Sequence, residues 1–267
     1  MLNLSDRGFV VDRAVFIPSI AFLLSTVGIV LLFPDASGAA FGTLQAAIVE
    51  NASWFYGIVM AVLLVASVVL AFSHVGTIRL GPDNSSPDYS LFSWLSMLFA
   101  AGVGIGLMFY GVAEPVVHYL RPPVGEGAAV GGENQAVNLT MLHWGFNAWS
   151  VYALMALVLA YFSFRRGLPL TLRSAFYPIL GDRIYGPWGA AIDVFAIVCT
   201  TFGISTSLGL GVEQLSTGLN YLFDVPESGG LKLAITVAIM AMAAVSVALG
   251  LDSGIKRLSE INSFLAI

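Results

Sequence analysis

The sequence predicts an all-α integral membrane protein. Of its 267 residues, 58% are hydrophobic and only 10% are charged, whereas a soluble domain carries about 25% charged residues. The mean hydropathy is +0.88, and the apolar residues fall in continuous runs of about 20, the length that crosses a bilayer as a helix. Because these runs do not alternate between apolar and polar residues, they predict helices rather than the strands of a barrel.

Six predominantly apolar runs are long enough to cross a bilayer, and the short linkers between them predict a single transmembrane domain over residues 1–267 without a separate soluble domain. A seventh run begins near Ile261 and is incomplete at residue 267, so we expect the chain to be the N-terminal portion of a longer protein, inactive alone. The six predicted spans are Ala14–Phe33, Ala52–Ser73, Leu91–Ala113, Asn138–Phe164, Ile184–Val212 and Leu233–Leu251.

The distribution of basic residues predicts a cytoplasmic N-terminus. With this orientation the outer loops hold only Arg121 and Lys232, and the other nine of the 11 basic residues are on the inside, as the positive-inside rule requires. We therefore expect a multi-pass protein of the inner (plasma) membrane, in contact with membrane lipid. The net charge of −5 gives no support to a nucleic-acid partner.

The third predicted span contains the stretch AAGVGIGLMFYGVAEP, in which Gly102, Gly104 and Gly106 stand two residues apart. Each glycine costs a helix about 1 kcal/mol relative to alanine. One interpretation is a discontinuous helix, in which unwound carbonyls bind a cation and the second half points its N-terminus at an anionic group. A small-residue packing face and a gentle kink are the alternatives. A dinucleotide-binding loop is excluded because the glycine spacing differs from G-x-G-x-x-G.

The fourth predicted span contains the stretch HWGFNAWSVY, in which Trp144, Trp149 and Tyr152 occupy an arc of about 140° on a regular helix. Trp149 and Tyr152 lie close to the middle of the span, where an interfacial aromatic belt is not expected. Aromatic faces attract cations by about 2 kcal/mol or more when desolvated. A quaternary ammonium group, which has no N–H to donate, is the cation best suited to ring faces. Ordinary helix packing is the alternative.

Other polar residues within the spans have more than one interpretation. His143 is either a proton site or a hydrogen-bonded packing residue. Glu114 either attracts cations or ends its helix, and Asp193 is expected to pair with Arg183 or another arginine. The sequence contains neither H-E-x-x-H nor G-x-S-x-G, and it has a single cysteine. We therefore predict no catalytic residues, no enzyme activity and no catalytic or structural metal site.

Three stretches, AAGVGIGLMFYGVAEP, HWGFNAWSVYAL and TTFGISTSLGLGVEQL, resemble the betaine/choline/carnitine transporter (BCCT) family over essentially the whole chain. The resemblance implies the LeuT-like fold of two inverted five-helix repeats, of which this chain holds the first repeat and two preceding helices. It also implies a homotrimer that carries glycine betaine, choline or carnitine by alternating access, for osmoprotection or nutrition. A membrane-embedded osmosensor, or an assembly subunit without transport, is the alternative function.

The resemblance also assigns substrate-binding roles to residues of this sequence. Trp144, Trp149 and Tyr152 match the aromatic cage of the family. The family's unwound, substrate-binding segment is matched by Gly102, Val103, Gly104, Ile105 and Gly106.

The coupling ion is left open between sodium and the proton, and no other cofactor is expected. Carbonyls that match those of Ala100 and Val103 hold a cation in sodium-coupled members. Thr200 matches one hydroxyl of a second sodium site, but Ile204 stands where the other hydroxyl is expected. Thr201 and Ser205 form an alternative pair, four residues apart, on a different face of the helix.

Overall fold

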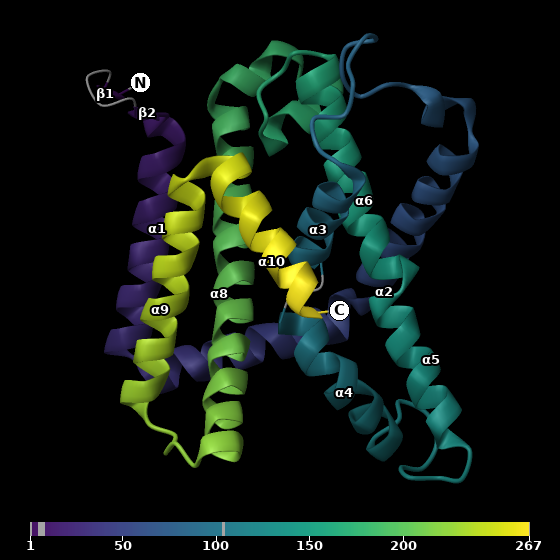
Figure 1. The fold of residues 1–267 in the computed structure, drawn as a ribbon, viewed down its shortest axis with the longest axis vertical. Coiled ribbons are helices and arrows are strands. Elements are labelled where there is room, and N and C mark those ends of the chain that lie inside the picture. Colours follow the sequence, from purple (N-terminus) through teal and green to yellow (C-terminus); the bar gives the residue numbers. More distant parts are fainter. Residues whose placement is uncertain (1, 5–8, 103–104, 267) are drawn as a thin grey trace. The chain divides into compact units, whose positions relative to one another are not determined.

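The computed structural model describes residues 2–4, 9–102 and 105–266. Within these ranges the regular elements are helices, apart from a short antiparallel pair of β1 (Leu2–Leu4) and β2 (Phe9–Val11) (Figure 1). Five helical segments of the described part are long and apolar enough to cross a membrane, when residues 132–165 are counted as one segment. The all-helical membrane architecture predicted from the sequence is therefore confirmed. The chain forms two compact units, residues 1–85 with 143–202 and residues 86–142 with 203–267.

The first unit begins with two helices joined by a single residue. The carboxylate of Asp12 caps α1 (Arg13–Leu32) by accepting the Ala14 N–H at 3.0 Å. After Phe33, α2 (Pro34–Phe72) starts with a proline, whose missing N–H costs nothing in the first turn.

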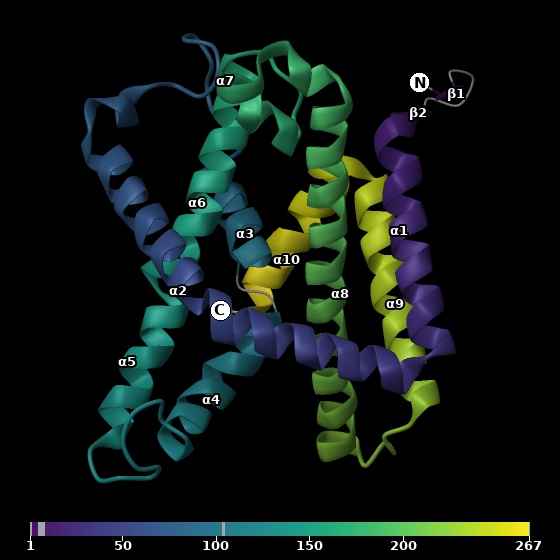
Figure 2. The same ribbon diagram turned by 180° about the vertical axis from the view of Figure 1, so that it is seen from behind.

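The linker expected between the first two spans, over residues 34–51, is wrong because this segment is the first part of α2. Its polar residues suggested a loop, but an alanine-rich segment that opens with proline favours a helix. At 1.5 Å per residue, the 39 residues of α2 have a contour length of about 58 Å, more than the roughly 45 Å of a whole bilayer. The helix is not straight and changes direction part-way along its length (Figure 2). It packs against α6 (Phe146–Ala160) (Figures 1 and 2).

Short elements connect the helices of the first unit at one end. A 3-10 turn, η2 (His74–Thr77), follows α2, and a π-helical turn, η3 (Tyr161–Arg165), extends α6. The chain then passes through η4 (Leu172–Phe176), α7 (Tyr177–Leu180) and η5 (Gly181–Tyr185) before it enters α8 (Pro187–Phe223).

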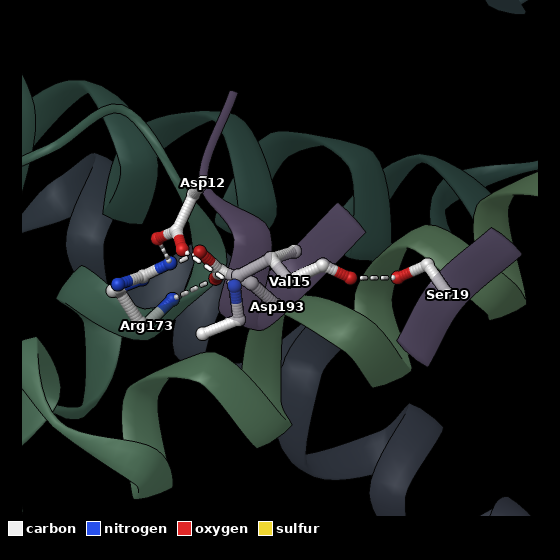
Figure 3. Close-up of polar contacts among 6 residues, drawn as sticks. Asp12, Val15, Ser19, Arg173 and Asp193 are labelled. Atoms are coloured by element: carbon white, nitrogen blue, oxygen red, sulfur yellow. Dashed lines mark hydrogen bonds and ion pairs between the residues drawn. The ribbon is translucent and has the colours of Figure 1, made fainter. Parts of the chain in front are cut away.

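Polar contacts, one of them buried, hold these connections in place. Asp193 of α8 accepts the backbone N–H of Arg173 at 3.0 Å and its Nε–H at 2.5 Å (Figure 3). Asp193 is buried, and the Arg173 side chain is only 12% exposed. The expectation that Asp193 pairs with an arginine is confirmed, with Arg173 as the partner. Arg165 forms a more exposed ion pair, at 2.6 Å, with Asp83 of the loop that follows η2.

The second unit contains α3 (Leu91–Gly102), α4 (Ile105–Leu120), most of α5 (Gly132–Trp144) and the latter part of α8. It continues with α9 (Gly229–Ala248), a π-helical turn η6 (Leu251–Ile255) and α10 (Lys256–Ala266). The predicted sixth span matches α9 within a few residues, and the predicted seventh begins within α10. Two predicted spans end too early, because α4 continues to Leu120 and α8 to Phe223.

We predict that Asp193→Ala lowers the free energy of unfolding by about 3–5 kcal/mol, because it removes the buried partner of the Arg173 charge and leaves only the longer contact to exposed Asp12. Unfolding in mixed micelles with increasing denaturing detergent measures this change. The double variant Asp193→Ala/Arg173→Met is expected to recover most of the loss, because both buried charges are then absent. A double variant as unstable as the single one would contradict this account of the pair.

Candidate functional site

The span that carries the predicted aromatic cage is interrupted at Gly145. We expected one helix over Asn138–Phe164, but α5 ends at Trp144 and α6 begins at Phe146. Gly145 has φ −83° and ψ −144°, which is not helical, and its carbonyl accepts the N–H of Trp149 at 3.3 Å. The arc of about 140° assumed a continuous helix, so it does not apply between Trp144 and the two rings on α6.

The aromatic residues form one ring pair on each side of this interruption. Trp149 and Tyr152 stand three residues apart on α6, with ring centroids 5.8 Å apart and planes inclined at 44°. His143 and Trp144 close α5, with centroids 4.9 Å apart. The interruption therefore separates the predicted cage residues into two groups, and closure of all three around one ligand stays a prediction.

The Trp149–Tyr152 pair has ring surface available for a ligand. Trp149 is 40% exposed and Tyr152 is 59% exposed within the chain. Ser150, between them in sequence, is buried, and its hydroxyl donates to the Asn147 carbonyl at 2.6 Å. One face of α6 is thus used for packing, whereas the two rings are left open. An open pair of π-faces on an apolar helix is suited to a cation that carries no hydrogen-bond donor.

The glycine-rich stretch is only partly described. Ala100 lies half-buried in the last turn of α3, which ends at Gly102, and α4 starts at Ile105 and includes Gly106. Val103 and Gly104 lie outside the described residues. The discontinuous helix and the cation-binding carbonyls therefore stay predictions, with the packing-face and kink alternatives still open.

The hydroxyl residues considered for sodium all stand on α8. Thr200 and Ser205 are exposed within the chain. The Thr201 hydroxyl donates to the Ile197 carbonyl at 2.8 Å, so its hydrogen is directed to its own helix while its oxygen can still accept or coordinate. The role of these three residues in sodium binding stays a prediction.

Glu114 is buried within α4, where it lies 3.3 Å from His118 one turn later. The interpretation that Glu114 ends its helix is wrong, because α4 continues through Pro115 to Leu120. A proline removes one backbone hydrogen bond, and neighbouring groups in membrane helices compensate for that loss.

The sequence did not predict the polar contact between α3 and α10. The Ser93 hydroxyl donates to Glu260 Oε1 at 2.7 Å and also lies 2.9 Å from the Ser90 hydroxyl. Serines at three- and four-residue spacing line this contact, and four of them are buried: Ser93, Ser96, Ser259 and Ser263. The serine spacing was visible in the sequence, but it did not reveal which helices would meet.

A second contact lies beside the start of α3. The Lys256 ammonium stands 5.7 Å from the centroid of the Tyr89 ring, within the range of a cation–π interaction. Desolvation and a hydrogen bond to Asp252 raise the pKa of Tyr89 above its ordinary value. Together with Ser93 and Glu260, these groups fix the start of α3, the helix whose last turn carries Ala100.

Comparison with known proteins identifies the family. A family model described as "BCCT, betaine/carnitine/choline family transporter" matches residues 14–267. The chain belongs to this family. The resemblance noted in the sequence is thereby confirmed, and the family consists of transporters rather than enzymes.

Several curated relatives are similar over nearly the whole chain. A "Glycine betaine transporter" of Acinetobacter baylyi is 47% identical over 98% of this chain and 40% of its own length. A "High-affinity choline transport protein" of Escherichia coli is 44% identical over 96% of this chain and 38% of its own length. A "Glycine betaine/proline/choline transporter" of Vibrio parahaemolyticus is 43% identical over 99% of this chain and 51% of its own length. The chain thus spans about two fifths to one half of the length of these relatives.

We predict that Glu260→Ala lowers the free energy of unfolding by about 1–3 kcal/mol, because the buried Ser93 hydroxyl loses a charged acceptor. Detergent-induced unfolding in mixed micelles measures the change. Glu227→Ala, in the exposed loop before α9, is the matched control and is expected to change stability by less than about 0.5 kcal/mol. Equal effects of the two substitutions would show that the Ser93–Glu260 bond does not stabilise the protein.

Proposed function

We propose that the protein expressed from the full reading frame is a secondary active transporter of a quaternary ammonium compound: glycine betaine, choline or carnitine. The observation that carries this proposal is the exposed Trp149–Tyr152 pair on an apolar helix of a BCCT-family chain. The printed names of the relatives, which include glycine betaine and choline transport, support this choice of substrate class.

The chemistry of the substrate explains why rings would bind it. A trimethylammonium group spreads its positive charge over methyl groups and offers no N–H, so carboxylates and carbonyls cannot fix it by hydrogen bonds. The negative faces of Trp149 and Tyr152 attract such a cation without directional donors. Betaine and choline share the trimethylammonium group and differ at the other end, where betaine has a carboxylate and choline has a hydroxyl. Groups other than the two rings must recognise this end. The resemblance assigns that role to the segment from Gly102 to Gly106.

The finer features of the proposal rest on the family resemblance. They are the LeuT-like inverted-repeat fold, alternating access around a site near the membrane midplane, a cytoplasmic N-terminus in the inner membrane, and a homotrimer. We propose sodium or a proton as the coupling ion. Ile204 stands in place of an expected hydroxyl, and this weakens sodium coupling at the second site unless Thr201 and Ser205 supply the ligands.

We predict that cells lacking their own uptake systems accumulate labelled choline or glycine betaine when they express the full reading frame. Trp149→Ala is expected to lower uptake at subsaturating substrate about 30-fold, the equivalent of losing about 2 kcal/mol of cation–π binding. Trp149→Phe should retain an intermediate rate because it keeps a weaker ring face. Comparison of uptake with and without sodium identifies the coupling ion.

Trp54→Ala is the matched control, because Trp54 is an exposed tryptophan on α2. Its uptake should equal that of the unsubstituted protein. No uptake of either compound, with the protein present in the membrane, would contradict the transport proposal and favour a sensor or an assembly subunit. Equal loss in the Trp54 and Trp149 variants would show that the effect is not specific to the ring pair.

A further inference from the structure

An apolar groove in the first unit lies between α1 and the beginning of α8. Its volume is about 870 Å³, within the range of sites for small organic ligands. On α1 it is lined by Pro18 and Phe22, and on α8 by Ala191, Val194 and Phe195. These apolar walls are suited to an aliphatic chain that lies along the two helices.

One end of this groove is charged, because Asp12 and Arg173 also line it. The Arg173 guanidinium forms a close ion pair through Nε with Asp193 at 2.5 Å and a longer one through Nη2 with Asp12 Oδ2 at 3.5 Å (Figure 3). One cation thus faces two carboxylates. The three groups together leave one net negative charge at the groove mouth.

Asp12 also has unused capacity to accept hydrogen bonds. Its Oδ1 receives the Ala14 N–H at 3.0 Å, and its side chain is 46% exposed. A carboxylate has about four lone-pair positions. At least one strong, charge-assisted hydrogen bond to Asp12 is thus still available to a donor that enters the mouth of the groove.

We propose that this groove binds phosphatidylethanolamine, with its primary ammonium group donating to Asp12 and an acyl chain lying between Phe22 and Phe195. Three features of the groove select this lipid. The negative mouth disfavours an anionic headgroup such as phosphatidylglycerol. The open acceptor on Asp12 favours an ammonium with N–H groups over the fully methylated head of phosphatidylcholine. The apolar walls require an acyl chain, which a free headgroup lacks.

This site is separate from the ring pair on α6, and the inference rests on the membrane location of the chain rather than on transport. The proposed binding differs from a general attraction of basic residues to anionic lipid, because the acidic residue Asp12 determines the preference for a headgroup with N–H donors. The uptake measurements and the lipid measurements can therefore fail independently of each other.

Native mass spectrometry of the full-length protein in detergent tests the proposal. The probes are phosphatidylethanolamine, phosphatidylcholine and phosphatidylglycerol with identical acyl chains. We expect the first tight lipid adduct to form with phosphatidylethanolamine at about fivefold lower concentration than with either of the others, which corresponds to about 1 kcal/mol. Equal affinities, or a preference for phosphatidylglycerol, would overturn the proposal.

Asp12→Asn is the decisive variant, because asparagine is as good an N-cap as aspartate but carries no charge. It should bind phosphatidylethanolamine and phosphatidylcholine equally while it keeps the helical content of the unsubstituted protein. Asp12→Ser, another good cap, replaces it if the asparagine variant does not fold. Asp35→Asn, in the exposed first turn of α2, is the control and should keep the preference. A preference that survives in both Asp12 variants would overturn the assignment.

Two further measurements identify where and how the lipid binds. Ala191→Trp fills the apolar wall and should weaken tight binding of all three lipids by at least fivefold. If binding is unchanged, the lipid lies elsewhere. Glycerophosphoethanolamine, the headgroup without acyl chains, should not compete. If it competes as well as the lipid, the site takes a soluble amine and the lipid proposal is wrong.

Discussion

The need to satisfy backbone hydrogen bonds inside the chain governs this structure. In hydrocarbon an unsatisfied N–H or C=O costs several kcal/mol, so the spanning segments are helices whose backbone bonds are internal. The polar side chains within those helices follow the same rule. The hydroxyls of Ser19, Thr26 and Thr201 donate to the carbonyl four residues earlier. Apolar side chains, in contrast, are mostly exposed at the surface of the chain, and no more than 11% of residues are buried in the 18-residue apolar window of any of the five candidate spans.

Because regular helices satisfy this requirement, a break in a helix marks a position with a special local environment. Gly145 interrupts the span of α5 and α6 between two aromatic ring pairs. Irregular backbone at membrane depth is tolerated only where protein or a water-filled cavity surrounds it. The non-helical residue Gly145 also separates Trp144, at the end of α5, from the two rings on α6. The exposed Trp149–Tyr152 pair offers ring surfaces on α6, and whether Trp144 joins it around one ligand stays a prediction.

Much of the fold followed from the sequence, because runs of about 20 apolar residues have few alternatives in a membrane. The interruption at Gly145 did not, because a single glycine costs a helix only about 1 kcal/mol and is often tolerated. The first part of α2 was missed because its scattered polar residues resembled a loop. The pairing of Asp193 with an arginine was foreseen, since a buried charge needs a partner, but only packing selects Arg173. The Ser93–Glu260 contact joins residues 167 apart and depends wholly on tertiary structure.

The central claim is that ring electrons at residue 149 bind the substrate cation. The most direct test replaces Trp149 with tryptophans carrying one, two and three ring fluorines, which weaken the ring face stepwise while hardly changing its size. Choline or glycine betaine affinity is then measured for each protein. The account predicts that the binding free energy falls in proportion to the number of fluorines. Unchanged affinity across the series, in a protein that loses binding on Trp149→Ala, would show that the ring acts by shape and contradict the claim.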